Sequence, residues 1–324
     1  MEWLIRNGGN AENMPGYDCK LSDRKPGKSN SAIGWTFITY GVVAEIIYAL
    51  DMIVMMRKRH RTLSCYKIML CLGFFDMAAI VVNSLITGYL WLKGSNYCTN
   101  PTFIFVAGTA GTGLWCGACM LCFILVINRL LDIWSKKAMH MIFKGSKTYV
   151  VLIIPVLYWL YFSFFTAPVL FNSDQTAWFF YTFAPGHSQE DYYNYPHTVN
   201  NLLIVAVTCL LYVLYSRVLL RHSKSTNGIP WAQKSFFIQC TSICMANLIA
   251  AVIYVYMQFF STPSYFVLIG HICWQLGHGF PAIVYLVLNR TIQREVFELL
   301  RINKLIKSHQ IHHSTAKTIV SVHT

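Results

Sequence analysis

A membrane-embedded bundle of seven helices is the fold class that the sequence predicts, and three observations predict it. The chain has 324 residues, of which 55% are hydrophobic and only 12% are charged, and its mean hydropathy is +0.45. A soluble domain carries about 25% charged residues. Apolar runs of about 18 residues or more, long enough to cross a bilayer, recur along the chain. Lys and Arg residues gather between alternate runs, as expected for a chain that crosses a membrane repeatedly.

Seven spans account for these runs. The stretch 235–289 carries no Asp, Glu, Lys or Arg. As one helix it would be about 80 Å long, more than twice the apolar thickness of a bilayer. It therefore has to turn once, and the sequence STPS at 261–264 is its strongest turn signal. The expected spans are residues 33–56, 66–92, 102–131, 148–171, 197–220, 235–260 and 265–288.

The distribution of positive charge predicts the orientation of the bundle. All but six of the 26 Lys and Arg residues fall on one side of the predicted membrane. Because positive residues concentrate in cytosolic loops, that side is expected to be the cytosol, with the N-terminus outside. The six exceptions, on the outer side, are Arg6, Lys20, Arg24, Lys25, Lys28 and Lys93.

The segment after the seventh span, residues 289–306, is expected to form an amphipathic helix on the cytosolic membrane surface. Ile292, Val296 and Leu299 recur at helical spacing, whereas Arg294 falls on another face. The chain is thus divided into an extracellular tail (1–32), the bundle (33–288), this surface helix and a polar cytosolic tail (307–324), which is expected to be disordered.

Arg129 ends the charge-free third span, within the sequence INRLLDIW. A charge at such a depth is usually functional, although an arginine at a cytosolic helix end can also simply extend toward the headgroups. Seven spans with an outer N-terminus resemble G-protein-coupled receptors, whose rhodopsin-like members carry Glu/Asp-Arg-Tyr here. Asn128 replaces the acid, so we expect Arg129 to be restrained by Asp132, one turn on, or by a neighbouring helix. Arg129 is the expected contact of the G protein, and Asn128 and Asp132 are expected to belong to the switch that controls it.

Asp76, Pro281 and Tyr285 are expected to belong to the same switch. Asp76 lies in LGFFD and the other two in GFPAIVYLVLNR, segments that resemble the Leu-x-x-x-Asp and Asn-Pro-x-x-Tyr motifs of rhodopsin-like receptors. Phe280 replaces the Asn, and Tyr285 lies four residues after Pro281 instead of three. Pro281 removes a backbone donor and predicts a kink. Asp76 should face the bundle interior, where it could equally be a protonated structural residue.

The cysteines suggest one disulfide and no metal centre. Cys116, Cys119 and Cys122 are spaced like metal ligands, but they lie inside a predicted span without a fourth ligand, so we interpret them as small buried residues. Cys98 lies at the outer end of the third span, which receptors often tie to the second extracellular loop. That loop, 172–196, has no cysteine. The remaining extracellular cysteine is Cys19, and we predict a disulfide between Cys19 and Cys98.

A small ligand is expected to enter a pocket in the outer half of the bundle. Gly111 stands where amine receptors place an acidic counter-ion, which argues against a biogenic amine. The outer loops between spans contain Lys93 but no other Lys or Arg, which disfavours a strongly anionic ligand. Many of the candidates combine an apolar body with a polar tip, although each could serve plain helix packing. The candidate ligand-facing residues are Thr112, Trp115, Asn200, Asn201, Tyr254, Tyr256, His271, Trp274 and Gln275.

Taken in order, these motifs resemble one family. LGFFD, a cysteine at the outer end of the third span, INRLLDIW, a short third cytosolic loop and HGFPAIVYLVLNRTIQREV are similar to the nematode serpentine receptors of class T (Srt), over roughly residues 30–305. The resemblance implies a seven-helix chemosensory receptor in sensory plasma membranes. It also implies that the receptor reads a small external chemical and signals to a heterotrimeric G protein.

Other classes of protein are disfavoured to different degrees. No lysine lies between Lys234 and Lys304, which excludes a light sensor with a Schiff-base lysine in the seventh span. His271 and His278 would lie about 10 Å apart along a helix, so we expect no zinc enzyme, no metal and no cofactor. The net charge of +13 is explained by membrane-flanking clusters, so no nucleic acid partner is expected. A seven-helix transporter or ion channel is the alternative that stays open.

Overall fold

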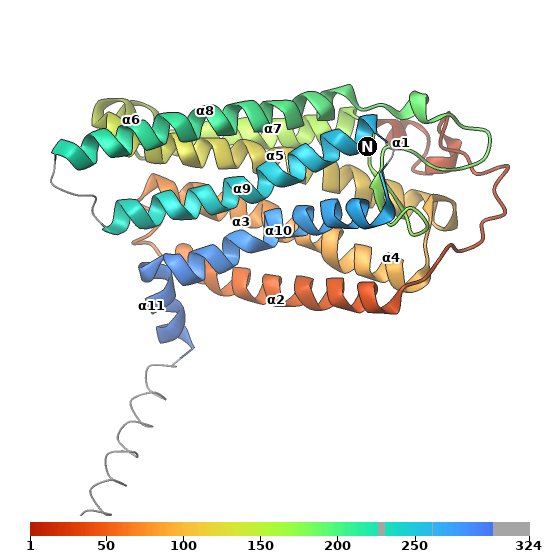
Figure 1. Cartoon of the computed structure of the whole chain (residues 1–324), viewed down its shortest axis with the longest axis horizontal. Coiled ribbons are helices and arrows are strands. Elements are labelled where there is room, and N and C mark those ends of the chain that lie inside the picture. The colour runs from red at the N-terminus through yellow and green to blue at the C-terminus, as the bar shows by residue number, and fades with distance from the viewer. Residues whose placement is uncertain (226–230, 261, 301–324) are drawn as a thin grey trace, which may run out of the picture.

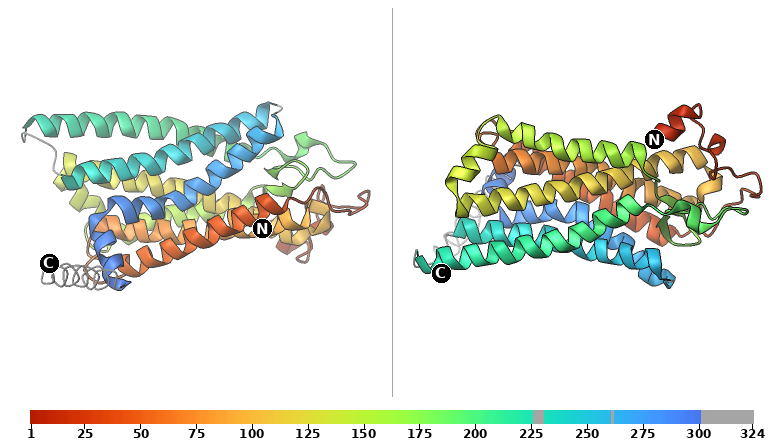
Figure 2. Two further views of the ribbon diagram at one scale, coloured as in Figure 1. Left: turned by 60° about the horizontal axis from the view of Figure 1, so that its bottom comes forward. Right: turned by 90° about the horizontal axis from the view of Figure 1, so that it is seen from above.

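The computed structural model of the chain describes residues 1–225, 231–260 and 262–300. Seven helices in this part of the chain are long and apolar enough to cross a membrane. They lie side by side, with their long axes running in roughly one direction (Figures 1 and 2). The predicted fold class, a bundle of seven membrane-crossing helices, is therefore confirmed.

The seven spans have the following bounds. They are α2 (Ser31–Met55), the continuous helix made of α3 (Ser64–Ile80), η2 (Val81–Ile86) and α4 (Thr87–Lys93), then α5 (Pro101–Trp134), α7 (Lys147–Phe165), α8 (Tyr195–Ser225), α9 (Trp231–Phe259) and α10 (Ser264–Leu288). The ends differ from the expected ones by only a few residues, except in the fourth span. Our expectation there, 148–171, is wrong, because α7 already ends at Phe165. Pro168 disfavours helical backbone in the residue before it, and the chain becomes extended.

The loop after α7 forms a small hairpin. Its strands are β1 (Leu170–Asn172) and β2 (Ala177–Phe179), which pair antiparallel with Phe171 opposite Trp178. Both aromatic side chains are buried. The hairpin therefore packs against the bundle and covers part of its outer end, as Figure 1 shows at the end that carries the N-terminus.

Helix α5 lies at the centre of the bundle. It is the most deeply buried span, with 78% of its membrane window inside the structure, and it contacts α3, α7, α8 and α9. Two glycines of the sequence GTAGTG explain how closely its neighbours approach. A Cβ atom on Gly108 would collide with the backbone carbonyl of Val169, and one on Gly113 would collide with Ser163 on α7.

The second span contains a π-helical segment, Val81–Ile86, between α3 and α4. The wider turn leaves the backbone carbonyl of Asn83 free to accept bonds from another helix. His271 Nε2 and the side-chain amide of Gln275, both on α10, each lie 2.9 Å from that oxygen. The irregular segment is therefore fixed by α10.

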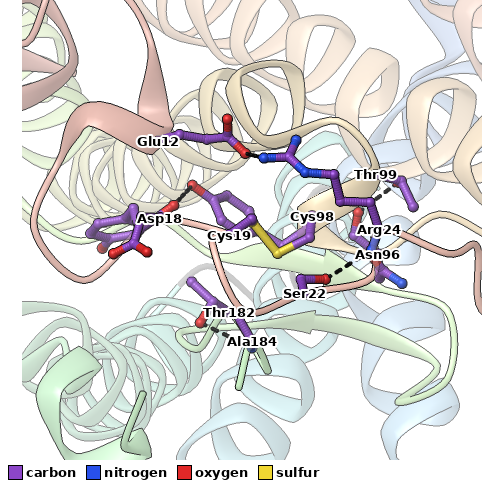
Figure 3. Close-up of a disulfide and its surroundings, with 12 residues drawn as sticks. Glu12, Asp18, Cys19, Ser22, Arg24, Asn96, Cys98, Thr99, Thr182 and Ala184 are labelled. Carbon is purple, nitrogen blue, oxygen red and sulfur yellow. Dashed lines mark hydrogen bonds and ion pairs between the residues drawn. A yellow bond between two sulfur atoms is a disulfide. The ribbon is translucent and has the colours of Figure 1, made fainter. Parts of the chain in front are cut away.

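The N-terminal segment folds over the outer end of the bundle. It contains α1 (Glu2–Arg6) and the short turn η1 (Ala11–Asn13), and a second turn, η3 (Tyr97–Thr99), leads into α5. The predicted disulfide between Cys19 and Cys98 is present, with 5.7 Å between the Cα atoms (Figure 3). The segment is also joined to the hairpin, because the backbone N–H of Lys28 donates to Asp174 Oδ1 at 2.9 Å.

The cytosolic end carries two short helices, α6 (Lys136–Phe143) between α5 and α7, and α11 (Arg290–Leu299) after α10. Helix α11 turns away from the direction of α10 (Figure 1). It buries Ile292 and Val296, as the apolar spacing predicted. The expected helix reached residue 306. Residues 301–306 and the predicted tail 307–324 lie outside the described residues.

Candidate functional site

A narrow cavity lies in the outer half of the bundle. It is bounded by helices α5, α8, α9 and α10 and by the segment that includes the β1–β2 hairpin. The free space in it is small, so a ligand much larger than water requires its walls to move. The lining residues are Gly111, Thr112, Trp115, Val169, Trp178, His197, Tyr254 and Trp274.

Small residues on α5 make the cavity possible. A Cβ atom on Gly111 would lie 3.2 Å from the end of the Trp274 indole, tighter than an ordinary contact. One turn earlier, the absence of a side chain on Gly108 admits the backbone of Val169. The Val169 N–H then lies 3.3 Å from Thr112 Oγ1, which itself donates to the Gly108 carbonyl. The second outer loop is thus held directly against α5.

Several cavity side chains are fixed by partners behind the wall. The indole N–H of Trp115 donates to Asn201 Oδ1 at 3.0 Å, and Asn200 donates to the same oxygen at 3.1 Å. Trp178 reaches from the hairpin to Thr87 on α4, with its N–H 3.0 Å from the hydroxyl oxygen. These hydrogen bonds fix two of the indoles that line the cavity.

The nine predicted ligand-facing residues fall into three groups. Thr112, Trp115, Tyr254 and Trp274 line the cavity. Asn200, Asn201, His271 and Gln275 are buried just behind it, where they position other groups. Tyr256 differs from the expectation: its side chain is 45% exposed and stacks on Phe260, with ring centroids 4.7 Å apart. It lies two residues after Tyr254, which places it on another face of α9.

Sequence reasoning missed four lining residues: Gly111, Val169, Trp178 and His197. The sequence shows Gly111 only as a position where amine receptors carry an acidic residue and this chain does not. Val169 and Trp178 lie in or beside the second outer loop, whose hairpin was not predicted although Asn172, Ser173 and Asp174 form a turn signal. His197 was placed at the very start of the fifth span, and only the tertiary packing turns it inward. Phe180 lies against its ring, at a centroid distance of 4.9 Å.

A buried acid lies below the cavity. Asp76 on α3 accepts a hydrogen bond from the Tyr48 hydroxyl at 2.6 Å, and its other oxygen lies 2.7 Å from Nδ1 of His278 on α10. The His278 ring contacts the Trp115 indole edge-to-face, with centroids 5.9 Å apart. One side chain of the cavity wall is therefore in contact with the pair that joins α3 to α10. The sequence predicted the inward position of Asp76 but not this partner.

Two further predicted switch residues lie on α10. Pro281 is inside the helix and Tyr285 is almost completely buried, one turn later. The Tyr285 hydroxyl has no hydrogen-bond partner among the described residues. Asp51 on α2 was not predicted as a site residue, yet it is buried and neither carboxyl oxygen has a partner in the described part of the chain. A buried acid of this kind is costly unless it is protonated.

Arg129 lies at the cytosolic end of α5 and is held mainly by a neighbouring helix. Its guanidinium stands 4.5 Å above the ring of Phe236 on α9, a cation–π contact. Asp132 is the weaker partner at 3.8 Å, because its carboxylate binds Lys136 at 2.7 Å. Only 11% of the Arg129 side chain is exposed. Of the two restraints that the sequence left open, the structure therefore favours the neighbouring helix.

Asn128 makes its bonds elsewhere. Its side-chain amide donates to Ser64 Oγ at the start of α3, at 2.9 Å, and lies 3.5 Å from the sulfur of Met139 on α6. It therefore joins α5 to α3 and α6 and does not restrain its neighbour Arg129. The residue that replaces the acid of the usual motif has a structural contact of its own.

Fold and site together define the class of protein. A bundle of seven membrane-crossing helices with a cavity near one end and a restrained arginine at the other is the arrangement of a seven-helix receptor of the G-protein-coupled type. The family model described as "Serpentine type 7TM GPCR chemoreceptor Srt" matches residues 5–310, and the chain belongs to this family. The resemblance inferred from the motifs is thus confirmed.

A curated relative supports the same conclusion. Serpentine receptor class T-55 from Caenorhabditis elegans is 27% identical over 311 residues, which cover 93% of this chain and 85% of the relative. The family is one of chemoreceptors and not of enzymes. The chain is a multi-pass protein of the plasma membrane.

Proposed function

We propose that this chain is a chemosensory receptor of sensory-cell membranes, which binds a small external ligand in the outer cavity and signals to a heterotrimeric G protein. The observation that carries the proposal is that two sites share the same helices. The cavity is lined by α5 and α9 at their outer halves, and Arg129 on α5 contacts Phe236 on α9 at the cytosolic end. A ligand that changes the packing of α5 against α9 would therefore affect both sites.

The proposed mechanism is a shift between two arrangements of the bundle. In the first, closed arrangement, the Arg129–Phe236 contact holds α9 against α5. A second contact holds α9 to α10, since Ser235 Oγ donates to the carbonyl of Leu288 at 2.6 Å. Ligand binding would favour the arrangement in which the cytosolic ends of α8 and α9 move away from α5. Arg129 would then be free to contact the G protein.

The test is a response assay in cells that express the full chain with a broadly coupling G protein, against a panel of small chemicals. Any activating compound should lose its effect on the Arg129→Ala variant, because the proposed contact is gone. Surface display, measured with an extracellular epitope tag, should be unchanged. Arg61→Ala is the matched control, since Arg61 is an exposed arginine of the first cytosolic loop. A normal response from Arg129→Ala would contradict the proposed role.

A further inference from the structure

The cavity walls carry polar groups of two kinds. Those of Thr112, Trp115 and Trp178 already have partners within the protein. Three others are shielded from water and have no hydrogen-bond partner among the described residues. They are Nδ1 of His197, the hydroxyl of Tyr254 and the indole N–H of Trp274.

Such groups are unusual in a folded protein. Buried polar atoms are nearly always paired, and each unpaired one destabilises the state that contains it. Here three of them gather around one cavity, on three different helices: α8, α9 and α10. A molecule that forms hydrogen bonds with these groups would therefore bind favourably and would also stabilise the folded receptor.

The chemistry of the walls limits what that molecule can be. None of the eight lining residues is Asp, Glu, Lys or Arg. A charged ligand would lose its hydration without gaining an opposite charge, which is strongly unfavourable. The Trp274 N–H can only donate a hydrogen bond, and the Tyr254 hydroxyl can donate one as well. The remaining surface is mostly indole ring, aliphatic side chain and glycine backbone.

We propose that this cavity binds a small, uncharged molecule with an apolar body and a hydrogen-bond-accepting oxygen, which is held by Trp274 and Tyr254. This assignment rests on the proposed function, since it names the ligand class of the same site. His197 supplies a third contact, as a donor or an acceptor according to its tautomer. The ligand thereby joins α9 and α10, and its body contacts Trp115, which packs on His278.

Entry requires the cavity to open. A second, larger pocket lies next to the first, and Trp178 and Tyr254 line both of them. The outer pocket is bounded mainly by aromatic residues of the second outer loop, such as Phe180 and Tyr193, and by the outer end of α9 at Met257. The side chains of Trp178 and Tyr254 therefore separate the two spaces. Trp178 is held by its hydrogen bond to Thr87, whereas the Tyr254 hydroxyl has no partner among the described residues, so rotation of Tyr254 is the step that admits a ligand.

Four probes of nearly equal size test the ligand class. They are acetophenone, which has one carbonyl acceptor and no charge; ethylbenzene, which has no acceptor; 1-phenylethylamine, which is a cation at neutral pH; and benzoate, an anion. The melting temperature of the purified full chain in lipid nanodiscs is measured against the concentration of each. Because a ligand of the native state raises the melting temperature by an amount that grows with the ratio of its concentration to its dissociation constant, acetophenone alone should give a concentration-dependent rise.

Two variants locate the contact. Trp274→Phe and Tyr254→Phe each remove one donor, so the apparent dissociation constant for acetophenone should rise about tenfold in each. Trp91→Phe is the matched control, because Trp91 is also buried with an unpaired indole N–H but does not line the cavity. It should leave the constant unchanged.

The four probes and three variants give results that support or contradict the proposed ligand class. An equal rise with ethylbenzene would show that the acceptor is irrelevant, and a rise with the amine or with benzoate would show that the charge argument is wrong. No rise with any probe, or an equal loss in Trp91→Phe, would overturn the assignment. A different outcome would separate the two proposals. If acetophenone bound the purified receptor, but neither it nor any other chemical gave a response in cells, the ligand class would stand and the proposed signalling function would be contradicted.

Discussion

At the scale of single residues, the contact between Arg129 and Phe236 is the feature with the clearest consequence. The usual acid beside the arginine is absent, and Asn128 is committed to Ser64. The aromatic face of Phe236 takes over the restraint. A cation–π contact of a partly desolvated arginine contributes about 1–2 kcal/mol, less than a buried salt bridge can, so the closed arrangement is held only loosely.

The Phe236→Leu variant should therefore raise ligand-independent signalling. Leucine keeps the apolar contact of α9 but removes the ring that attracts Arg129, so the open arrangement gains population by about two- to tenfold. The measurement is basal second-messenger production, normalised to surface display. Phe236→Tyr keeps an aromatic face and should behave like the natural chain; a rise of equal size in both variants would contradict the cation–π explanation.

The sequence located Arg129, Asp76 and Asn128 because a polar residue within an apolar span is conspicuous. It could not supply their partners. Phe236 is one of many aromatic residues in apolar runs, and His278 was weighed only as a possible metal ligand with His271. Which residue meets Arg129 or Asp76 depends on the rotation and tilt of helices that lie more than a hundred residues apart in the chain.

At the scale of elements, helix α11 shows how a surface helix is docked. Glu295 is completely buried and binds Arg57, Arg59 and His60 from the loop that follows α2. Burial alone would raise the pKa of the Glu295 carboxyl, but the hydrogen bond from His60 and the charge of Arg59 bring this pKa below its usual value. The amphipathic pattern predicted the helix, whereas the ion cluster came only from the tertiary structure.

The docking of α11 should consequently depend on pH. A carboxyl whose pKa is lower in the docked state contributes its full stabilisation above the ordinary value of about 4.3, and loses it as the pH falls through the lowered pKa. Spin labels at Met56 and Leu299 should report a constant distance from pH 7 down to about pH 5 and a longer one in stronger acid. Glu295→Gln should show the longer distance already at pH 7.

The matched control for this experiment is Glu298→Gln. Glu298 lies on the same helix but is exposed. Removal of its charge should leave both the distance and its pH dependence unchanged. If Glu295→Gln behaved like Glu298→Gln, the ion cluster would not be what docks α11.

At the scale of the whole molecule, the outer end is closed by three segments that are far apart in the sequence: the N-terminal segment, the turn η3 before α5, and the second outer loop with its hairpin. The disulfide fixes the N-terminal segment to the start of α5, and Tyr17 packs against Tyr97, Phe105 and Tyr192 from the bundle and the second outer loop. The hairpin places Trp178 over the cavity. The roof of the cavity is therefore a tertiary structure in its own right and not a loose tail.

Loss of the disulfide should destabilise the whole receptor. Cys19 and Cys98 are separated by 79 positions, and closing a loop of that length restricts the unfolded chain by about 4 kcal/mol in the entropic description. Cys98→Ser should lower the melting temperature of the purified protein, and adding Cys19→Ser should lower it no further. Cys209→Ser, which removes an exposed free thiol, is the control. A further fall in the double variant would mean that the thiols act separately.

The number of spans, their approximate ends, the disulfide and the family could all be predicted from the amino-acid sequence alone. The spans and the disulfide follow from short-range physics or from elimination: apolar length, the side on which Lys and Arg gather, and two cysteines with no other extracellular partner. The family follows from the resemblance of motifs such as LGFFD and INRLLDIW to the class T serpentine receptors. The main errors were also local, since Pro168 ended the fourth span early and Tyr256 was placed on the wrong face of its helix.

The candidate site, in contrast, depends on tertiary contacts. The cavity depends on Gly108 and Gly111, which allow the backbone of a loop and the indole of Trp274 to approach α5. Its unpaired polar atoms come from three different helices, on His197, Tyr254 and Trp274. The restraint on Arg129 depends on the ring of Phe236. Inside a membrane every span must be apolar, whatever it contacts, so composition hardly distinguishes a residue that faces lipid from one that faces a ligand.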